Sequence, residues 1–402
     1  MIQIPQGFRL AVANADFRGK KLSRNDLSLA FSDRPAAAAG VFTTNLFRAA
    51  PVLVSQQNIR EAGERGVRGV LFNSGQANAC TGDKGRENCL QTLAMVRKAL
   101  SEAGESLEER ELLPASTGVI GAQMPMDKWA AAVPQLVSSL GHASVEDLAR
   151  AMMTTDAYPK MSGREISLSG GVVRLAGVAK GAGMICPNMA TMLSLVMCDA
   201  DVEQSLWSDM FRRAADATFN RVSVDGDTST NDSLYGLANG ASGVAVCGED
   251  AAILEAALTE VLGELAYMLV KDGEGATKVM HIHVTGAATH ADAEQVARTI
   301  GHSQLVKTAM FGRDPNWGRI VAAAGRAGVA FDPHDLVVTL CGVELFRHGQ
   351  PTDLDFDALL EKPLENVDLP LDIVLGSGPG EARLLASDLS HGYVSLNSDY
   401  RS

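Results

Sequence analysis

The order of helical and strand segments constrains the fold of this chain more than any other feature. Apolar residues recur every three or four positions in six stretches, which predicts helices at 83–103, 126–140, 145–153, 203–219, 251–270 and 292–300. Short apolar runs between them predict strands at 69–72, 165–168, 172–175, 191–198, 280–284, 336–340 and 371–375. Some of these strands follow one another directly, and others alternate with helices. This order predicts a layered mixed α/β architecture and disfavours a Rossmann fold or a barrel.

The length of the chain predicts more than one domain. It has 402 residues, of which 46% are hydrophobic and 21% are charged, as is typical of a globular protein of two or three domains. A boundary is indicated near 272–275, because shorter elements and two Asp-Pro turns follow it. We therefore expect a catalytic α/β region over 1–275 and a smaller α+β region over 276–402.

Charge and hydropathy argue against two kinds of partner, nucleic acid and membranes. The 48 acidic residues outnumber the 35 basic ones, the net charge is −13, and no long basic run is present, so a nucleic-acid partner is disfavoured. Neither an apolar run of about 18 residues nor a signal peptide is visible, so we expect no membrane partner and a cytoplasmic location. The six cysteines are scattered and form no Cys-x-x-Cys pair. We expect them to be reduced thiols, buried as small hydrophobic residues.

Three further patterns are typical of metal or phosphate sites, but each lacks a necessary residue. His281 and His283 would share one face of a strand without a third ligand, so a structural pair is favoured over a metal site. A calcium loop that started at Asp225 would need glycine at its sixth position and glutamate at its twelfth, where the chain has Thr230 and Gly236, so we interpret the acidic segment 225–232 as a hydrogen-bonded turn near the site. The glycines of 376–380 lack the Lys-Ser/Thr ending of a P-loop and indicate a surface turn. We expect no metal and no cofactor.

One loop-to-strand junction suggests a reactive threonine. A threonine hydroxyl is a weak nucleophile, but at a chain start its α-amine, with a pKa near 8, can take the hydroxyl proton. Cleavage between Ala190 and Thr191 would create that amine. Gly181 and Gly183 permit unusual backbone angles before the bond, Pro187 fixes another, and alanine leaves the scissile carbonyl accessible. The same residues also fit an ordinary tight loop that enters a buried strand.

Distinctive blocks of sequence lie along nearly the whole chain, at 41–45, 49–51, 73–82, 115–121, 153–160, 180–193, 219–232, 271–278, 314–319 and 397–402. In this order they resemble the glutamate N-acetyltransferase (ornithine acetyltransferase) family of arginine biosynthesis. The resemblance implies an α/β sandwich of the self-processing N-terminal-nucleophile type. It also implies a precursor that cuts itself into an α chain (1–190) and a β chain (191–402), which stay associated as two α and two β chains.

The resemblance further implies a ping-pong reaction on Thr191, which takes the acetyl group of N2-acetyl-L-ornithine as an ester and passes it to L-glutamate. Some relatives also use acetyl-CoA as the donor, and the sequence leaves that choice open. The tetrahedral oxyanion would be stabilised by the Thr117 hydroxyl and the Gly118 N–H. The implied substrate contacts are Thr154, Lys180, Thr191, Glu274, Asn397 and Ser402, with the lysine for a carboxylate and the glutamate for an ammonium.

Each of these assignments has an ordinary alternative. Thr117 and Gly118 also fit a polar turn, Lys180 a solvated surface lysine, and Glu274 a loop carboxylate. The chain departs from many relatives at Ala182, where they have serine, and over 386–390.

Two other functions remain open at this point. A self-processing amidase or aminopeptidase would use the same terminal threonine but release the acyl group to water. An uncut relative would act as a binding protein, and its intact mass would distinguish it.

Overall fold

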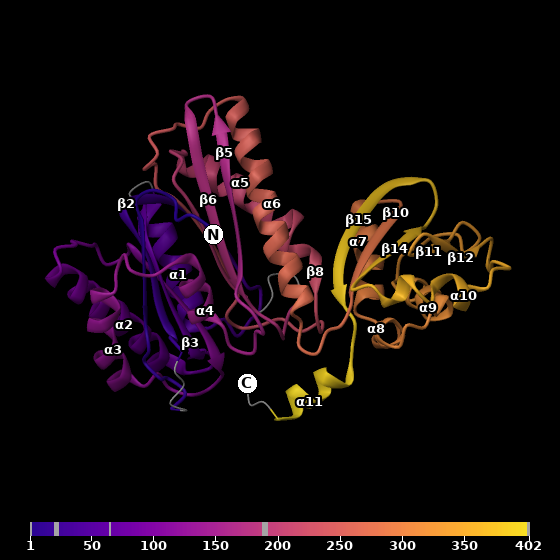
Figure 1. Ribbon diagram of the computed structural model, residues 1–402, viewed down its shortest axis with the longest axis horizontal. Coiled ribbons are helices and arrows are strands. Elements are labelled where there is room, and N and C mark those ends of the chain that lie inside the picture. The colour runs from indigo at the N-terminus through magenta and orange to yellow at the C-terminus, as the bar shows by residue number, and fades with distance from the viewer. Residues whose placement is uncertain (1, 20–23, 64–65, 187–191, 400–402) are drawn as a thin grey trace.

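The structure is a computed structural model that describes residues 2–19, 24–63, 66–186 and 192–399 (Figure 1). Within these ranges, eight strands form a first sheet in the order β4-β3-β2-β9-β7-β6-β5, with β1 paired to β2. These strands are β1 (Phe8–Ala13), β2 (Leu27–Phe42), β3 (Val67–Gln76), β4 (Leu112–Val119), β5 (Lys160–Leu168), β6 (Gly171–Lys180), β7 (Leu193–Cys198) and β9 (Ser233–Ala238).

The long strand β2 folds the first sheet over onto itself. Its first part pairs with β1 and β3, and its second part, from Ala37 onward, pairs with β9. The two halves of the sheet face each other and enclose an apolar interior. There the rings of Phe72 on β3 and Tyr235 on β9 meet edge to face with their centroids 6.3 Å apart, and Val178 and Leu195 are fully buried beside them. Stacked sheets with interdigitated side chains are a stable way to bury two apolar faces.

Helices cover the outer faces of both halves. Trp129 on α3 (Met126–Ser138) and Leu93 on α2 (Gly82–Glu102) pack against β1, β2 and β3, while Trp207 and Phe211 on α5 (Gln204–Ala217) and Leu258 on α6 (Glu249–Lys271) pack against the other half. The result is a helix–sheet–sheet–helix sandwich, which confirms the layered mixed α/β architecture. The helices of this region are α1 (Ala50–Ala62), α2 (Gly82–Glu102), α3 (Met126–Ser138), α4 (Val145–Met152), α5 (Gln204–Ala217), the 3-10 turn Phe219–Arg221 and α6 (Glu249–Lys271).

The second sheet has the order β13-β12-β11-β14-β10-β15-β8. On one face its apolar residues pack against α7 (His290–Gly301), α8 (Gln304–Phe311) and α9 (Trp317–Gly325). The elements are β8 (Val222–Ser223), β10 (Val279–Gly286), β11 (Val337–Leu340), β12 (Val343–Arg347), β13 (Gln350–Pro351), β14 (Asp368–Val374), β15 (Gly378–Ser387), α7 (His290–Gly301), α8 (Gln304–Phe311), α9 (Trp317–Gly325), α10 (Phe356–Leu360) and the 3-10 turn Pro363–Glu365.

Three segments connect the smaller sheet to the sandwich. The short strand β8 belongs in sequence to the first region, yet it pairs in parallel with β15. After β15 the chain forms α11 (His391–Asp399), which Figure 1 shows reaching back beneath the sandwich. The segment between α6 and β10 runs from one sheet to the other, and we propose the domain boundary at 275 on that basis.

All six helices expected from periodicity are present as α2 to α7, with ends within a few residues of those expected. Capping explains why α4 begins where it does: Ser144 and Asp147 form a reciprocal capping box. The expected strands are present as β3, β5, β6, β7, β10, β11 and β14, although Thr191, at the expected start of β7, lies outside the described residues. Sequence periodicity missed the strands β1, β2, β4, β9, β12 and β15, the two-residue strands β8 and β13, and the helices α1, α8, α9, α10 and α11.

Two sequence predictions were wrong. The glycines at 376–380 do not form only a surface turn, because β15 begins at Gly378 and pairs there with Gly286. Cys80 and Cys247 are exposed, so the expectation that the cysteines are buried is wrong for these two. The expectation that they are free thiols agrees with the structure for all six. In the described part of the chain, no helix is long and apolar enough to cross a membrane.

Candidate active site

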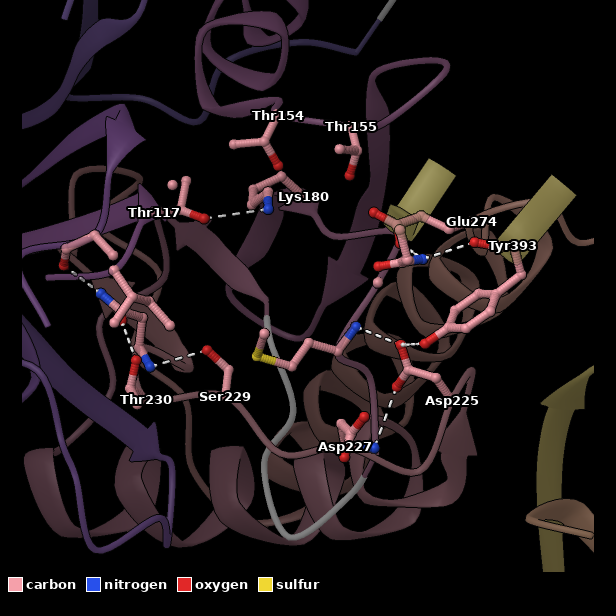
Figure 2. Close-up of a pocket in the computed structure, with 17 residues that line it drawn as sticks. Thr117, Thr154, Thr155, Lys180, Asp225, Asp227, Ser229, Thr230, Glu274 and Tyr393 are labelled. Atoms are coloured by element: carbon pink, nitrogen blue, oxygen red, sulfur yellow. Dashed lines mark hydrogen bonds between the residues drawn. The ribbon is translucent and has the colours of Figure 1, made fainter. Parts of the chain in front are cut away.

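One pocket of about 740 Å³, including its open mouth, lies where several strand ends and loops of the sandwich meet α11 (Figure 2). Every predicted site residue that the structure describes lines this pocket: Thr117, Gly118, Thr154, Lys180, Glu274 and Asn397. They come from five separate segments of the chain. Ala190, Thr191 and Ser402, which the sequence also assigns to the site, lie outside the described residues.

Thr117 and Gly118 lie near the end of β4, where this strand runs parallel to β3. The backbone of Gly118 has a φ of +135°, and an added Cβ would lie 2.2 Å from the carbonyl carbon of Gly75. A side chain at this position would therefore push the two strand ends apart. The close approach explains why glycine follows Thr117 and excludes a loosely held polar turn.

Lys180 is the last residue of β6, and in the antiparallel pairing with β7 it lies opposite Leu193. The cation is therefore held beside a residue only two positions after Thr191. Its side chain points into the pocket, the residue is 3% exposed, and its Nζ donates a hydrogen bond of 3.3 Å to the Thr117 hydroxyl (Figure 2). A solvated surface lysine is thus contradicted. Burial lowers the pKa of this ammonium, and the Asp156 carboxylate opposes the shift.

Glu274 and Asn397 form the side of the pocket nearest the C-terminus. The Glu274 amide donates to the Ala182 carbonyl at 2.7 Å, and its carboxylate accepts a 2.8 Å hydrogen bond from the Asn397 side chain on α11. Gly275 allows α11 to approach, because at its φ of +69° an added Cβ would lie 2.3 Å from the Tyr393 nitrogen. The predicted contribution of the chain's tail to the pocket is therefore present for Asn397.

Two aspartates of the acidic segment hold the chain on both sides of 187–191. Asp225 accepts hydrogen bonds from the amides of Met184 and Ile185, at 2.5 and 2.9 Å. Asp232 accepts a 2.9 Å bond from the Met192 amide. The segment is thus a hydrogen-bonded turn, and it lines the pocket, which places it near the candidate site.

The carboxyl group of Asp232 is buried, and its hydrogen bonds to the described residues do not satisfy both of its oxygens. Burial raises the pKa of its carboxyl group well above the ordinary value. Its Oδ2 has no hydrogen-bond partner with good geometry among the described residues, although the hydroxyls of Thr43 and Ser229 lie close enough to lower the pKa somewhat. Such an atom is unusual in a folded interior and is a candidate for proton exchange.

A model of the ArgJ family matches residues 9–402. The chain belongs to the ArgJ family. A relative from Nitratidesulfovibrio vulgaris, named arginine biosynthesis bifunctional protein ArgJ, is 62% identical over 398 residues, or 99% of each chain. A relative of the same name from Thermosynechococcus vestitus is 44% identical and covers 98% of this chain and 96% of its own. The crystal structure of arginine biosynthesis bifunctional protein argJ from Bacillus halodurans is similar, with a TM-score of 0.49 and 33% sequence identity. The match covers 51% of this chain and 98% of that chain.

Sequence reasoning missed several residues that line the pocket of this ArgJ-family chain. They include Thr155, Asp227 and Tyr393, whose hydroxyl donates to Asp225 at 3.4 Å. Asp225 and Asp227 lie in the acidic segment that was interpreted as a turn near the site, without a role for either side chain.

Candidate metal ligands do not gather near this pocket. Among the described residues, no group of three His, Cys, Asp or Glu side chains is arranged to hold a metal ion. His281 and His283 each contact a surface carboxylate instead, Asp368 at 2.7 Å and Glu381 at 3.0 Å. These contacts support the interpretation of the two histidines as a structural pair.

Proposed function

We propose that this chain is a self-processing acetyltransferase of arginine biosynthesis, which moves the acetyl group of N2-acetyl-L-ornithine to L-glutamate through Thr191. One observation carries the proposal: a buried lysine, a threonine hydroxyl and a tightly packed glycine meet in one pocket beside the start of β7. The names of the relatives, which place them in arginine biosynthesis as bifunctional proteins, support the pathway.

In the first reaction, the Thr191 Oγ attacks the carbonyl carbon of Ala190. The C–N bond breaks, an ester forms, and the threonine nitrogen gains a proton and becomes a free amine. Water then hydrolyses the ester and separates an α chain from a β chain. No α-amine is available before the cut, so the hydroxyl proton needs another acceptor. We assign that role to Asp232, because it accepts the amide N–H of the next residue, Met192, and because burial raises its pKa and so makes its carboxylate a stronger base.

In the second reaction, the new α-amine takes the proton of its own hydroxyl. The Oγ attacks the acetyl carbonyl of the donor, the donor's C–N bond breaks, and ornithine leaves with that proton. The amine of L-glutamate then attacks the acetyl ester, the ester C–O bond breaks, N2-acetyl-L-glutamate leaves, and the proton that the amine loses returns to the Thr191 Oγ. With acetyl-CoA as donor, the same ester would form and the thiol would leave.

The pocket supplies the other groups that this chemistry needs. The Thr117 hydroxyl and the Gly118 N–H are assigned to the tetrahedral oxyanion, where one well-placed donor contributes about 3–4 kcal/mol. Lys180 is assigned to the α-carboxylate that donor and acceptor share. Glu274 is assigned to the side-chain ammonium of ornithine. We further propose that Ser402 joins Asn397 at the substrate, and that two α and two β chains assemble in the cytoplasm.

Incubation of the purified protein with N2-acetyl-L-ornithine and L-glutamate tests the proposal. The expected result is N2-acetyl-L-glutamate and ornithine in equal amounts, with little acetate. Acetate release that does not depend on glutamate would support the amidase alternative. A cut chain that produces neither acetate nor N2-acetyl-L-glutamate would contradict the proposal.

A further inference from the structure

Three charged side chains, Asp156, Lys160 and Asp272, form a buried row beside segments that line the pocket. The proposed reaction does not use them. The side chains of Asp156 and Lys160 are fully buried, and that of Asp272 is 5% exposed. The Lys160 ammonium bridges the two carboxylates, at 2.7 Å from Asp156 and 2.5 Å from Asp272. Buried charges are expensive, so such a row is retained where it serves a purpose or is fully hydrogen-bonded.

Asp156 also holds two segments that line the pocket. One of its oxygens accepts a 2.9 Å bond from the Thr154 amide, and the other accepts a 2.6 Å bond from the Gly181 amide, directly after Lys180. Both of its oxygens are thus committed to protein donors. Through these bonds, one carboxylate fixes the backbone beside two residues assigned to the substrate.

Asp272 extends this arrangement to a third segment. It accepts a 3.0 Å bond from the Ala157 amide, and it lies two residues before Glu274. The row Asp156–Lys160–Asp272 therefore ties together the segments that carry Thr154, Lys180 and Glu274. These segments are far apart in sequence, so their relative position depends on such contacts.

The row also sets the electrostatic surroundings of Lys180. In the described part of the chain, Lys180 makes no ion pair with a carboxylate, and its one hydrogen bond to Thr117 is long at 3.3 Å. Its ammonium is thus left to bind an incoming anion. The charged groups that act on it come from five segments: Asp156 after α4, Lys160 on β5, Glu274 after α6, Arg18 after β1 and Asp232 before β9.

We propose that Asp156 is a positioning residue for the substrate carboxylate. Asp156 holds the backbone around Lys180 and keeps this lysine charged, while the positive charge of Lys160 limits this electrostatic effect. The inference rests on the proposed role of Lys180. Both substrates share the α-carboxylate, so Asp156 affects the binding of each.

The sign of the effect follows from charge. Lys180 binds a carboxylate while it is protonated, so binding weakens as the pH rises through its pKa. Removal of the negative charge of Asp156 moves this loss to lower pH. Removal of the positive charge of Lys160 moves it to higher pH. A neighbouring charge in partly buried surroundings contributes on the order of one pKa unit. A purely structural contact would not produce shifts of opposite sign.

The test is calorimetric titration of the processed protein with L-ornithine at several pH values between about 7 and 10. Binding does not require turnover, so the result is independent of whether acetyl transfer occurs. We expect Asp156→Asn to move the alkaline loss of affinity down by about one pH unit, so that on the alkaline side of the profile it binds L-ornithine roughly tenfold more weakly than the wild type does. Lys160→Met should move it up. The amines of ornithine titrate identically with every variant, so differences between variants report on the protein.

Asp250→Asn is the matched control. Asp250 is also a buried carboxylate, 6% exposed, and it accepts bonds from the amide and hydroxyl of Ser169 far from the pocket. It should lose stability and keep the wild-type pH profile. Wild-type affinity and an unshifted profile in Asp156→Asn would overturn the inference, as would shifts of the same sign in Asp156→Asn and Lys160→Met. If Asp156→Asn does not fold, Lys160→Met alone tests the inference. A loss of L-ornithine affinity at lower pH than in the wild type, or at the same pH, would then overturn it. Failure of wild-type protein to transfer acetyl would overturn only the proposed function.

Discussion

Replacement of Lys180 by methionine separates the contribution of this lysine to catalysis from its contribution to stability. The residue is 3% exposed, and its ammonium has one long hydrogen bond, to Thr117. Methionine has a similar length and no charge. Asp156 keeps its partner Lys160 in this variant. A buried ammonium that is not ion-paired carries a desolvation cost, and its replacement by an apolar side chain of similar length removes that cost. We therefore expect a melting temperature that is unchanged or raised.

The same change should severely impair the reaction. Loss of one partner of a desolvated, hydrogen-bonded charge pair costs about 3 kcal/mol, which corresponds to a roughly hundredfold lower kcat/KM. The loss should be similar for N2-acetyl-L-ornithine and for L-glutamate, because both present an α-carboxylate. Steady-state kinetics with each substrate varied in turn, together with thermal unfolding of the same samples, measures both effects.

Lys278→Met is the matched control. Lys278 is 5% exposed, but its ammonium donates two 2.8 Å hydrogen bonds, to the carbonyls of Glu365 and Asn366. Its removal leaves these acceptors unsatisfied and should lower stability by about 2 kcal/mol or more, while acetyl transfer persists. The reasoning is refuted if Lys180→Met lowers the melting temperature as much as Lys278→Met does, or if it keeps most of the wild-type kcat/KM.

Three further changes test other parts of the site. Gly118→Ala places a Cβ 2.2 Å from Gly75 at a φ of +135°, so it should lower the melting temperature and reduce transfer by about a hundredfold or more; wild-type kinetics would remove this residue from the oxyanion site. Asp232→Asn should slow the appearance of the two fragments in a mass-spectrometric time course, and an unchanged rate would contradict its role as proton acceptor. Gly275→Ala places a Cβ 2.3 Å from the Tyr393 nitrogen and should displace α11, which raises the KM for donor more than it lowers kcat and speeds proteolysis at the C-terminus; an unchanged KM would show that α11 does not contribute to donor binding.

The regular elements could be predicted where burial follows a simple period. The helix α6 buries one face in the core of the sandwich, and β10 buries alternate residues in the core of the smaller sheet, so the spacing of their apolar residues reveals them. The helix α11 has no buried residue, and polar contacts such as that of Asn397 hold it in place. Hydrophobic periodicity therefore gives no signal there. The alanine-rich half of β2 is likewise a weak strand pattern, and its pairing with β9 decides its structure.

The candidate site could be predicted only where resemblance to a family assigned roles to residues. The burial of Lys180 was not predictable, because lysine is usually solvated and its neighbours in space come from other segments. The Asp156–Lys160–Asp272 row depends on an ion pair between residues 112 positions apart. No local pattern encodes such a contact. The acidic segment was recognised as a turn, yet its attachment to Met184, Ile185 and Met192 required the three-dimensional structure.

The central claim is that one threonine serves first in the cut and then in the transfer. The most direct measurement is mass spectrometry of the protein after incubation with N2-acetyl-L-ornithine in the absence of glutamate, with Thr191→Ala beside it. The account predicts two fragments in the wild type, the second beginning at Thr191 and carrying one acetyl group on that residue, and a single chain of 42.4 kDa in the variant. A wild-type chain that stays whole, is cut at another bond, or is acetylated elsewhere would contradict it.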